Sequence, residues 1–163
     1  MNAREFALGA LGAADLPDLT DLWVAAWRAT GMPVDFEARR EWFIAHLEKL
    51  ASSGADIVVA RDGDGALAGF VTMDRESGHL DQLCVAPARQ GEGVARVLLG
   101  EAKARAPGCV RLEVNADNLR ACRFYQREGF VATGRGVSPL SGLPILFMQW
   151  NAAGIERKQS AEV

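Results

Sequence analysis

The sequence is poor in the residues that build metal sites, redox motifs and cross-linked scaffolds. Its 163 residues include two histidines, three cysteines and one tyrosine. The cysteines, Cys84, Cys109 and Cys122, form no CxxC pair and no short Cys/His cluster. These absences argue against a disulfide scaffold and against a structural zinc site. We therefore expect free thiols, no metal and a reducing, cytoplasmic setting.

An excess of one charge sign and long apolar runs are also missing. The net charge is −3, and Lys and Arg are mixed with Asp and Glu along most of the chain, whereas nucleic-acid-binding proteins carry a basic patch or stripe. No apolar run approaches the roughly 18 residues that a membrane span needs. Arg4, Glu5 and Asp15 interrupt the weakly apolar start, which argues against a secretory signal. We expect neither nucleic acid nor a membrane as a partner.

Apolar residues are abundant enough for a folded core. They make up 49% of the chain, which is usual for a globular protein, and the length suits one domain of roughly 100–200 residues. No repeat, low-complexity segment or convincing linker divides the sequence. We expect one domain over residues 1–150 and a polar C-terminal tail over residues 151–163.

Hydrophobic spacing and turn residues predict the element order β-α-α-β-β-β-α-β-α-β-β. A strong hairpin signal is the Asp-Gly-Asp-Gly turn at residues 62–65, which two β-rich runs flank. The residues expected to begin or end elements are Asp15, Gly31, Asp35, Pro87, Asn118 and Gly129. Hairpins combined with a β-α-β crossover imply an α/β fold, with a mixed sheet of six to seven strands flanked by about four helices.

A glycine-rich loop joins the strand at residues 79–85 to the helix that follows. Residues 90–95 read Gln-Gly-Glu-Gly-Val-Ala. Glycines let the backbone approach an anion, and a helix N-terminus offers unpaired N–H groups and partial positive charge. This combination suits a diphosphate. The loop is neither a Walker loop nor GxGxxG. The alternative is a plain strand-to-helix turn in which glycines only provide tightness.

Two ordered motifs give this chain its resemblance to a known family. The loop fits Q/R-x-x-G-x-G/A, and a second segment fits N-x-x-A-x-x-x-Y-x-x-x-G-F. The residues in register in the second motif are Asn118, Ala121, Tyr125, Gly129 and Phe130. Over roughly residues 78–131 the chain resembles the GNAT N-acetyltransferases. The rest of the chain agrees with that family in element order only.

The resemblance implies the GNAT acyl-CoA N-acyltransferase fold and acetyl-CoA as co-substrate. It implies that the strands at residues 79–85 and 109–113 splay apart to admit the pantetheine arm, which pairs with the backbone like an added strand. The cofactor-binding residues carried over are Leu83, Cys84, Val85, Gln90, Gly91, Glu92, Gly93, Val94, Ala95, Arg96 and Asn118. We expect the Glu92 side chain to point outward, because a carboxylate suits a diphosphate poorly.

Tyr125 is the expected partner of the leaving thiolate. A phenol has a pKa near 10, above the roughly 8.5 of a thiol, so its neutral form can donate to the thiolate. The alternative is a core or capping tyrosine on an amphipathic helix, which its register in the family motif disfavours. Cys84 has no recognisable base partner, so we expect direct attack in a ternary complex rather than an acyl-cysteine. A backbone N–H near residues 83–85 is the expected oxyanion donor.

The general base is left open among four candidates. Glu113 resembles the base of the family's peptide N-terminal acetyltransferases, but it could equally be a strand-end carboxylate paired with an arginine. Asp81 and His79 lie on the splayed strand and are expected to share a face by period two; water is the fourth candidate. A lysine-like amine, with a pKa near 10.4, needs a base more than an α-amine near 7.8 does.

The sequence thus predicts an acetyl-CoA-dependent N-acetyltransferase acting on a primary amine. The acceptor is a small molecule, an amino acid, an antibiotic or a peptide N-terminus. Residues 30–34 and 138–144 are candidate walls of its site, and the resemblance also suggests a homodimer. The alternative function is a catalytically silent acyl-CoA-binding sensor or regulatory module; an interaction module that uses only the fold fits the two cofactor signatures less well.

Overall fold

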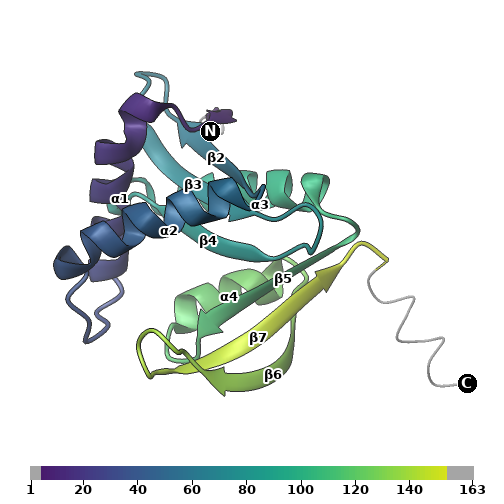
Figure 1. Cartoon of the computed structure of the whole chain (residues 1–163). Helices are drawn as coiled ribbons and strands as arrows, with labels where there is room; N and C mark the ends of the chain where they lie inside the picture. Colours follow the sequence, from purple (N-terminus) through teal and green to yellow (C-terminus); the bar gives the residue numbers. More distant parts are fainter. Residues whose placement is uncertain (1–4, 154–163) are drawn as a thin grey trace, which may run out of the picture.

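The computed structural model describes residues 5–153. That part of the chain contains seven strands and four α-helices (Figure 1). The strands are β1 (Ala7–Ala10), β2 (Asp56–Arg61), β3 (Leu67–Met73), β4 (Leu80–Val85), β5 (Cys109–Asn115), β6 (Val131–Val137) and β7 (Pro144–Asn151). The helices are α1 (Leu16–Arg28), α2 (Arg40–Ser52), α3 (Val94–Arg105) and α4 (Leu119–Arg127), with short 3-10 turns at Ala13–Asp15, Glu37–Arg39 and Pro87–Arg89. The predicted element order is confirmed.

The strands form two antiparallel sheets rather than one continuous sheet. One has the order β1-β2-β3-β4 and the other β5-β7-β6. A single parallel bridge between His79 and Arg111 connects them, supported by the Arg111 N–H donating to the Gly78 carbonyl at 2.9 Å. Beyond this bridge β4 and β5 have no ladder, which agrees with the splay that the family resemblance implied. The prediction of an α/β fold with six to seven strands and four helices is confirmed.

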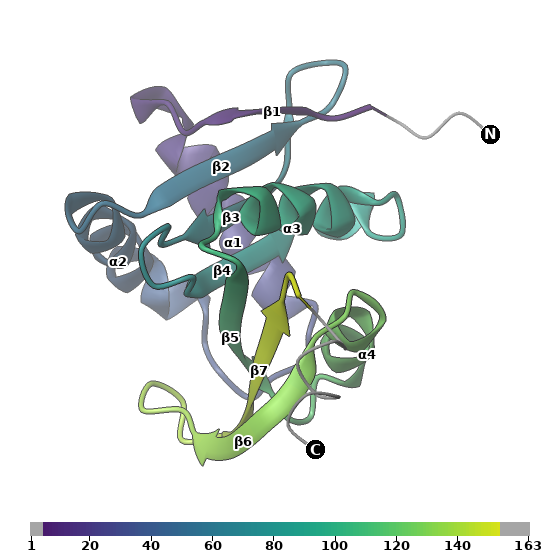
Figure 2. The same cartoon turned by 90° about the vertical axis from the view of Figure 1, so that its right-hand side faces the viewer.

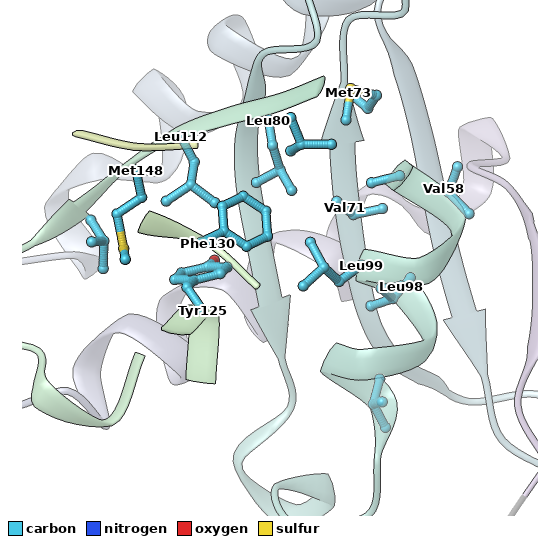
Figure 3. Close-up of a cluster of buried hydrophobic side chains, with 14 of the residues drawn as sticks. Val58, Val71, Met73, Leu80, Leu98, Leu99, Leu112, Tyr125, Phe130 and Met148 are labelled. Atoms are coloured by element: carbon cyan, nitrogen blue, oxygen red, sulfur yellow. The ribbon is translucent and has the colours of Figure 1, made fainter. Parts of the chain in front are cut away.

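Helices cover both faces of the first sheet (Figure 2). On one face α1 and α2 pack over β2 to β4 around Trp23, Phe43 and Phe70. On the other face α3 packs through Leu98 and Leu99 into a cluster that continues to β5, α4 and β7. Figure 3 shows part of this second cluster, with Tyr125 beside Phe130. This cluster spans both sheets, so side-chain packing holds them together where backbone pairing stops.

One expected side-chain cap and one helix start differ from the sequence prediction. Asp15 directly precedes α1, but its carboxylate accepts the Gly12 N–H at 2.8 Å and pairs with Arg61 at 2.5 Å, so it makes no side-chain cap. Asp35 caps a 3-10 turn by accepting the Ala38 N–H at 3.2 Å, and α2 begins only at Arg40. In both places a 3-10 turn precedes the α-helix, and the carboxylate accepts a hydrogen bond at that turn instead of capping the α-helix.

The other residues that were predicted to begin or end elements do so in the structure. Asn118 accepts the Ala121 N–H at 3.2 Å as the N-cap of α4, and Gly129 follows that helix in the left-handed region at φ +93°. Gly31 has φ +74° after α1. The predicted tail is shorter at its start, because β7 runs through Asn151; most of it, residues 154–163, lies outside the described residues.

No helix in residues 5–153 is both long and apolar enough to cross a membrane.

Candidate active site

A cavity of about 550 Å³ opens where the two sheets part. The end of β4, the glycine loop, the start of α3, the helix α4 and the end of α1 all contribute to its wall. Its lining residues are Ala26, Trp27, Ala29, Thr30, Leu83, Cys84, Val85, Arg89, Gln90, Gly91, Gly93, Val94, Ala95, Arg96, Asn118, Arg120, Ala121, Phe124, Tyr125, Arg127 and Glu128. The volume lies within the roughly 300–1,000 Å³ usual for small-molecule sites. Both family motifs therefore face one cavity.

The glycine loop forms one end of this cavity. Gly91 and Gly93 have φ values of +81° and +88°, in the left-handed region that glycine tolerates best. A Cβ added at either position would meet no heavy atom within 4 Å, so the space above the loop is open to a ligand. The α3 helix starts at Val94, and the N–H groups of its first turn have no intrahelical partner. The residues present fit a diphosphate.

Arginines surround this end. Arg96, Arg120 and Arg127 line the cavity, and the Arg120 guanidinium donates to the Gln90 side-chain carbonyl. This places positive charge around an open helix N-terminus, as an anionic ligand requires. Arg120 lies two residues after Asn118 in the second motif, which is the signal by which the sequence could have identified it.

Glu92 is the one predicted cofactor residue that does not line the cavity. Its carboxylate lies 3.5 Å from Arg89, which also pairs with Asp62 of the β2–β3 turn at 2.5 Å. The expectation that this side chain avoids the ligand is consistent with that placement. Arg89 thereby ties the loop to a hairpin that lies 27 residues earlier in the chain.

Near the end of β4 the cavity wall contains backbone groups of that strand, the Cys84 thiol and the side chain of Asn118. Leu83, Cys84 and Val85 line it, and β4 is the last strand of its sheet, so one of its edges has no strand partner there. Burial raises the pKa of the Cys84 thiol to about 12, which disfavours the thiolate and an acyl-cysteine route. The side-chain oxygen of Asn118 is used in the α4 cap, which leaves its amide N–H groups for a ligand.

Tyr125 lies at the inner wall of the cavity. It is 8% exposed, and its ring packs edge-on against Phe130 with 5.4 Å between centroids (Figure 3). No described residue hydrogen-bonds its hydroxyl in the structure, although the side chain lines the cavity. Burial raises the pKa of this phenol above its usual value near 10, and the neighbouring Cys84 and Cys122 act in the same direction. The hydroxyl is therefore a neutral donor.

Glu113 lies outside the cavity lining and is paired. Its Oε2 is 2.7 Å from His79 Nε2, with side chains 41% and 35% exposed. The hydrogen bond raises the pKa of His79 and lowers that of Glu113, partly offset by desolvation in each case. The sequence anticipated pairing of Glu113 with an arginine as the alternative to catalysis; the partner is a histidine from β4's side of the junction.

Asp81 and His79, which we expected to share one face, flank Leu80 at the start of β4, and both pair with polar residues rather than joining the α3-side cluster that contains Leu80. Thr72 pairs with Gln82 and Met73 pairs with Leu80, so Asp81 is an extra residue in a β-bulge. Leu80 packs in the α3-side cluster, while Gln82 accepts a hydrogen bond from Trp23 of α1 at 3.3 Å. Bulges re-aim side chains, and Asp81 is hydrogen-bonded to His46 of α2, a residue that the sequence analysis did not select.

One of the two predicted acceptor walls lines the cavity, and the other contacts the segment that joins α1 and α2. Thr30 lines the cavity, and the Asn115 amide lies 3.2 Å from the Met32 sulfur, which docks the α1–α2 loop on the end of β5. In the β6–β7 loop, the Leu140 carbonyl accepts from Arg39 at 3.3 Å. These contacts bring two loops about 100 residues apart to the same side of the molecule.

Comparison with known proteins identifies the family. The family model for an acetyltransferase (GNAT) domain matches residues 38–151. Peptidyl-lysine N-acetyltransferase YjaB of Salmonella typhimurium is 31% identical over 115 residues, which are 69% of this chain and 77% of YjaB. The chain therefore belongs to the GNAT acetyltransferase family.

Solved structures show the same architecture. The solution structure of apo YjaB from Escherichia coli superimposes with a TM-score of 0.71 at 28% identity, covering 90% of this chain and 97% of YjaB. A PaiA N-acetyltransferase from Thermoplasma acidophilum, solved in complex with coenzyme A, gives a TM-score of 0.71 at 20% identity, covering 90% and 99% of the two chains. At that identity the second likeness is evidence for the fold alone.

Proposed function

We propose that this chain transfers an acetyl group from acetyl-CoA to a primary amine by direct attack in a ternary complex. The observation that carries the proposal is one continuous cavity, which runs from the glycine loop past the open edge of β4 to the hydroxyl of Tyr125. Acetyl-CoA, when bound, supplies the acetyl group as an activated thioester. Residues 1–150 would form the catalytic domain. We also propose a cytoplasmic setting, which the three unpaired cysteines support.

The cofactor contacts are proposed residue by residue. The loop from Gln90 to Ala95, followed by Arg96, would hold the diphosphate through backbone N–H groups and charge. The backbone of Leu83, Cys84 and Val85 would pair with the pantetheine arm, and the amide of Asn118 would donate to it. An N–H in residues 83–85 would also stabilise the developing oxyanion. Glu92 would contribute its backbone only, since its side chain faces Arg89.

Tyr125 and Glu113 are the proposed catalytic residues. The raised pKa of Tyr125 lies further above the roughly 8.5 of a thiol than that of a free phenol does. Its role is therefore to hydrogen-bond the departing sulfur more than to give up a proton completely. Glu113 remains a candidate proton acceptor, although its pairing with His79 lowers its pKa and hence its basicity.

A peptide lysine is the first acceptor to test. The relatives named peptidyl-lysine N-acetyltransferase support this choice, and peptide N-termini, free amino acids and amine antibiotics complete the panel. The walls formed by residues 30–34 and 138–144 would contact the acceptor.

Calorimetry with acetyl-CoA tests the cofactor site. Wild type should bind with a dissociation constant in the micromolar range, which corresponds to a binding free energy on the order of −8 kcal/mol. Gly93→Glu should abolish binding, because it places a side chain and a negative charge above the loop at φ +88°. Binding equal to wild type in Gly93→Glu would reject this cofactor site. Thiol release over the amine panel then tests turnover; tight binding without turnover on any amine would favour a silent sensor.

A further inference from the structure

A second imidazole–carboxylate pair lies near the start of β4, outside the residues that line the cavity. His46 Nε2 is 2.6 Å from Asp81 Oδ2, and the two side chains are 21% and 22% exposed. The pair connects the middle of α2 to the bulge of β4. It is more enclosed than the His79–Glu113 pair, whose side chains are 35% and 41% exposed.

Several contacts hold this pair in one arrangement. Trp42 stacks on the His46 ring, with 4.7 Å between centroids and 12° between planes. On the carboxylate side, Gln82 donates to Asp81 Oδ2 at 3.3 Å and accepts from the Trp23 indole N–H at 3.3 Å. The chain of donors from Trp23 through Gln82 ends on Asp81, which must therefore accept at Oδ2. A side chain locked by such contacts is positioned, as a catalytic group has to be.

The hydrogen bond to Asp81 also fixes the histidine tautomer. When the carboxylate accepts from Nε2–H, the neutral imidazole carries its lone pair on Nδ1. No described residue donates to Nδ1 in the structure. A base oriented by a carboxylate on its other nitrogen is the arrangement that activates many amine and hydroxyl nucleophiles.

Asp81 lies on β4 two residues before Leu83, which lines the cavity. Its charge contributes, after the Glu113 contacts, to the raised pKa of His79 at the junction. It also adds to the effect of burial on the pKa of Cys84, whose side chain lines the cavity. The His46 side chain itself contacts Trp42 on its own helix and Asp81 on β4.

We propose that His46, oriented by Asp81, accepts the proton of the acceptor ammonium, directly or through one water. This assignment rests on the proposed N-acetyltransferase function. The ammonium gives one proton to His46 Nδ1, and the free amine forms the C–N bond at the thioester carbon. The C–S bond then breaks, and the second proton of the attacking nitrogen passes to the leaving sulfur, which the Tyr125 hydroxyl hydrogen-bonds. His46 returns its proton to solvent, which its partial exposure permits.

The test compares variants on two amines after wild-type turnover is measured. His46→Gln can still donate an amide hydrogen bond to Asp81 but has no basic nitrogen. With a lysine side chain as acceptor, kcat should fall about 10²-fold, as expected for loss of a general base. With an α-amine, whose pKa near 7.8 leaves more of it neutral, the loss should be several-fold smaller. Calorimetric affinity for acetyl-CoA should match wild type.

Further variants separate proton transfer from structure. Added imidazole should restore part of the kcat of His46→Ala, which repair of a structural defect would not explain. Asp81→Asn should lower kcat with little change in the KM for acetyl-CoA, since Asp81 acts as a positioning residue. Glu48→Gln, on the exposed side of α2, is the matched control and should behave like wild type.

The outcomes are distinguishable. An active wild type in which His46→Gln retains full kcat on lysine, or in which Glu113→Gln alone causes the loss, overturns this assignment and leaves the proposed function standing. Equal losses on both amines without imidazole rescue also overturn it. A wild type that binds acetyl-CoA but acetylates no amine overturns both the proposed function and the role of His46.

Discussion

At the residue scale, Tyr125 combines a packing role with a proposed chemical one. Its ring belongs to the cluster that spans the two sheets, next to Phe124 and Phe130. Its hydroxyl has no hydrogen-bond partner in residues 5–153 and lies on the cavity wall. The two roles are separable, because phenylalanine keeps the ring and removes only the hydroxyl.

Tyr125→Phe should therefore affect turnover and leave folding intact. We expect kcat to fall about 10²-fold, the lower end of what a positioned proton donor contributes. The free energy of unfolding should change by less than about 1 kcal/mol, because no protein hydrogen bond is lost. Steady-state kinetics and urea unfolding check the two parts. Unchanged kcat would remove Tyr125 from the chemistry.

The His79–Glu113 pair gives a pH-dependent contribution to stability. The lowered pKa of Glu113 means that its contribution is complete above its ordinary 4.5 and is lost as pH falls through the lowered value. The raised pKa of His79 means that its contribution is complete below its ordinary 6.5 and is lost as pH rises through the raised value. The pair thus stabilises the fold most between about pH 4.5 and 6.5.

His79→Gln should therefore destabilise at mildly acidic pH only. Because both side chains are more than a third exposed, we expect roughly 0.2–1 kcal/mol at pH 5.5 and almost nothing at pH 9. Urea unfolding of both proteins at the two pH values is the measurement, and 1 M salt should shrink the acidic difference. A difference of equal size at both pH values would contradict the pair's ionic character.

The site residues show where sequence reasoning stops at this scale. Tyr125, Asn118 and the glycines of residues 90–95 were found because their spacing along the chain is itself the signal. His46 was missed because its partner, Asp81, is 35 residues away and meets it only through the packing of α2 on β4. No local pattern distinguishes such a histidine from an ordinary half-buried one.

At the element scale, the end of α4 shows how a single glycine determines local geometry. Gly129 has φ +93°, and a Cβ there would lie 3.2 Å from the Trp150 ring of β7. The turn it forms directs Phe130 into the cluster beside Tyr125 (Figure 3). Helix end, core residue and cavity wall therefore depend on one left-handed position.

Gly129→Ala should destabilise the protein by about 1–2 kcal/mol, the usual cost of a left-handed non-glycine residue, with some addition from the Trp150 contact. Gly100→Ala is the matched comparison. Gly100 lies within α3 without positive φ and with open space around it. That change should stabilise by roughly 0.5–1 kcal/mol. Thermal or urea unfolding gives both values; the same sign for both would refute the argument.

Most elements were predictable because their signals are local. The hairpin at residues 62–65 is closed by a hydrogen bond from the Asp62 N–H to the Ala66 carbonyl at 2.9 Å, as its turn residues indicated. The bulge at Asp81 was not predictable, because it arises from the register of β4 against β3. The start of α2 was misplaced at Asp35, because the 3-10 turn that precedes α2 has the same carboxylate signature. Asp15 was correctly placed before α1, although its side chain does not cap that helix.

At the scale of the whole molecule, the cavity joins two bodies of structure. Its wall comes from β4 and α3 on one side and from α4, which follows β5, on the other. A ligand there would contact the first sheet and the helix that follows β5, while backbone pairing between the two sheets is limited to the His79–Arg111 bridge. Binding energy should therefore appear as stability of the entire fold.

Acetyl-CoA at about 100 times its dissociation constant should stabilise the folded state by about 2.7 kcal/mol. For a chain of this length that corresponds to a rise in melting temperature of roughly 5–10 °C. Differential scanning calorimetry of wild type and Gly93→Glu makes the comparison. The variant should show no rise; a rise of the same size in both would place the ligand elsewhere.

The separation of the sheets has a consequence for amide hydrogen exchange. An edge strand has backbone N–H groups that no neighbour protects, and β4 is such an edge between His79 and Val85. Every second amide of β4 should exchange with deuterium quickly in the free protein. The amides between them point toward β3, which pairs with the other edge of β4, and should exchange slowly. Although β4 lies in the interior of the fold, its amides would thus exchange like those of an outermost strand. Its amides would become slow only when a ligand completes the ladder.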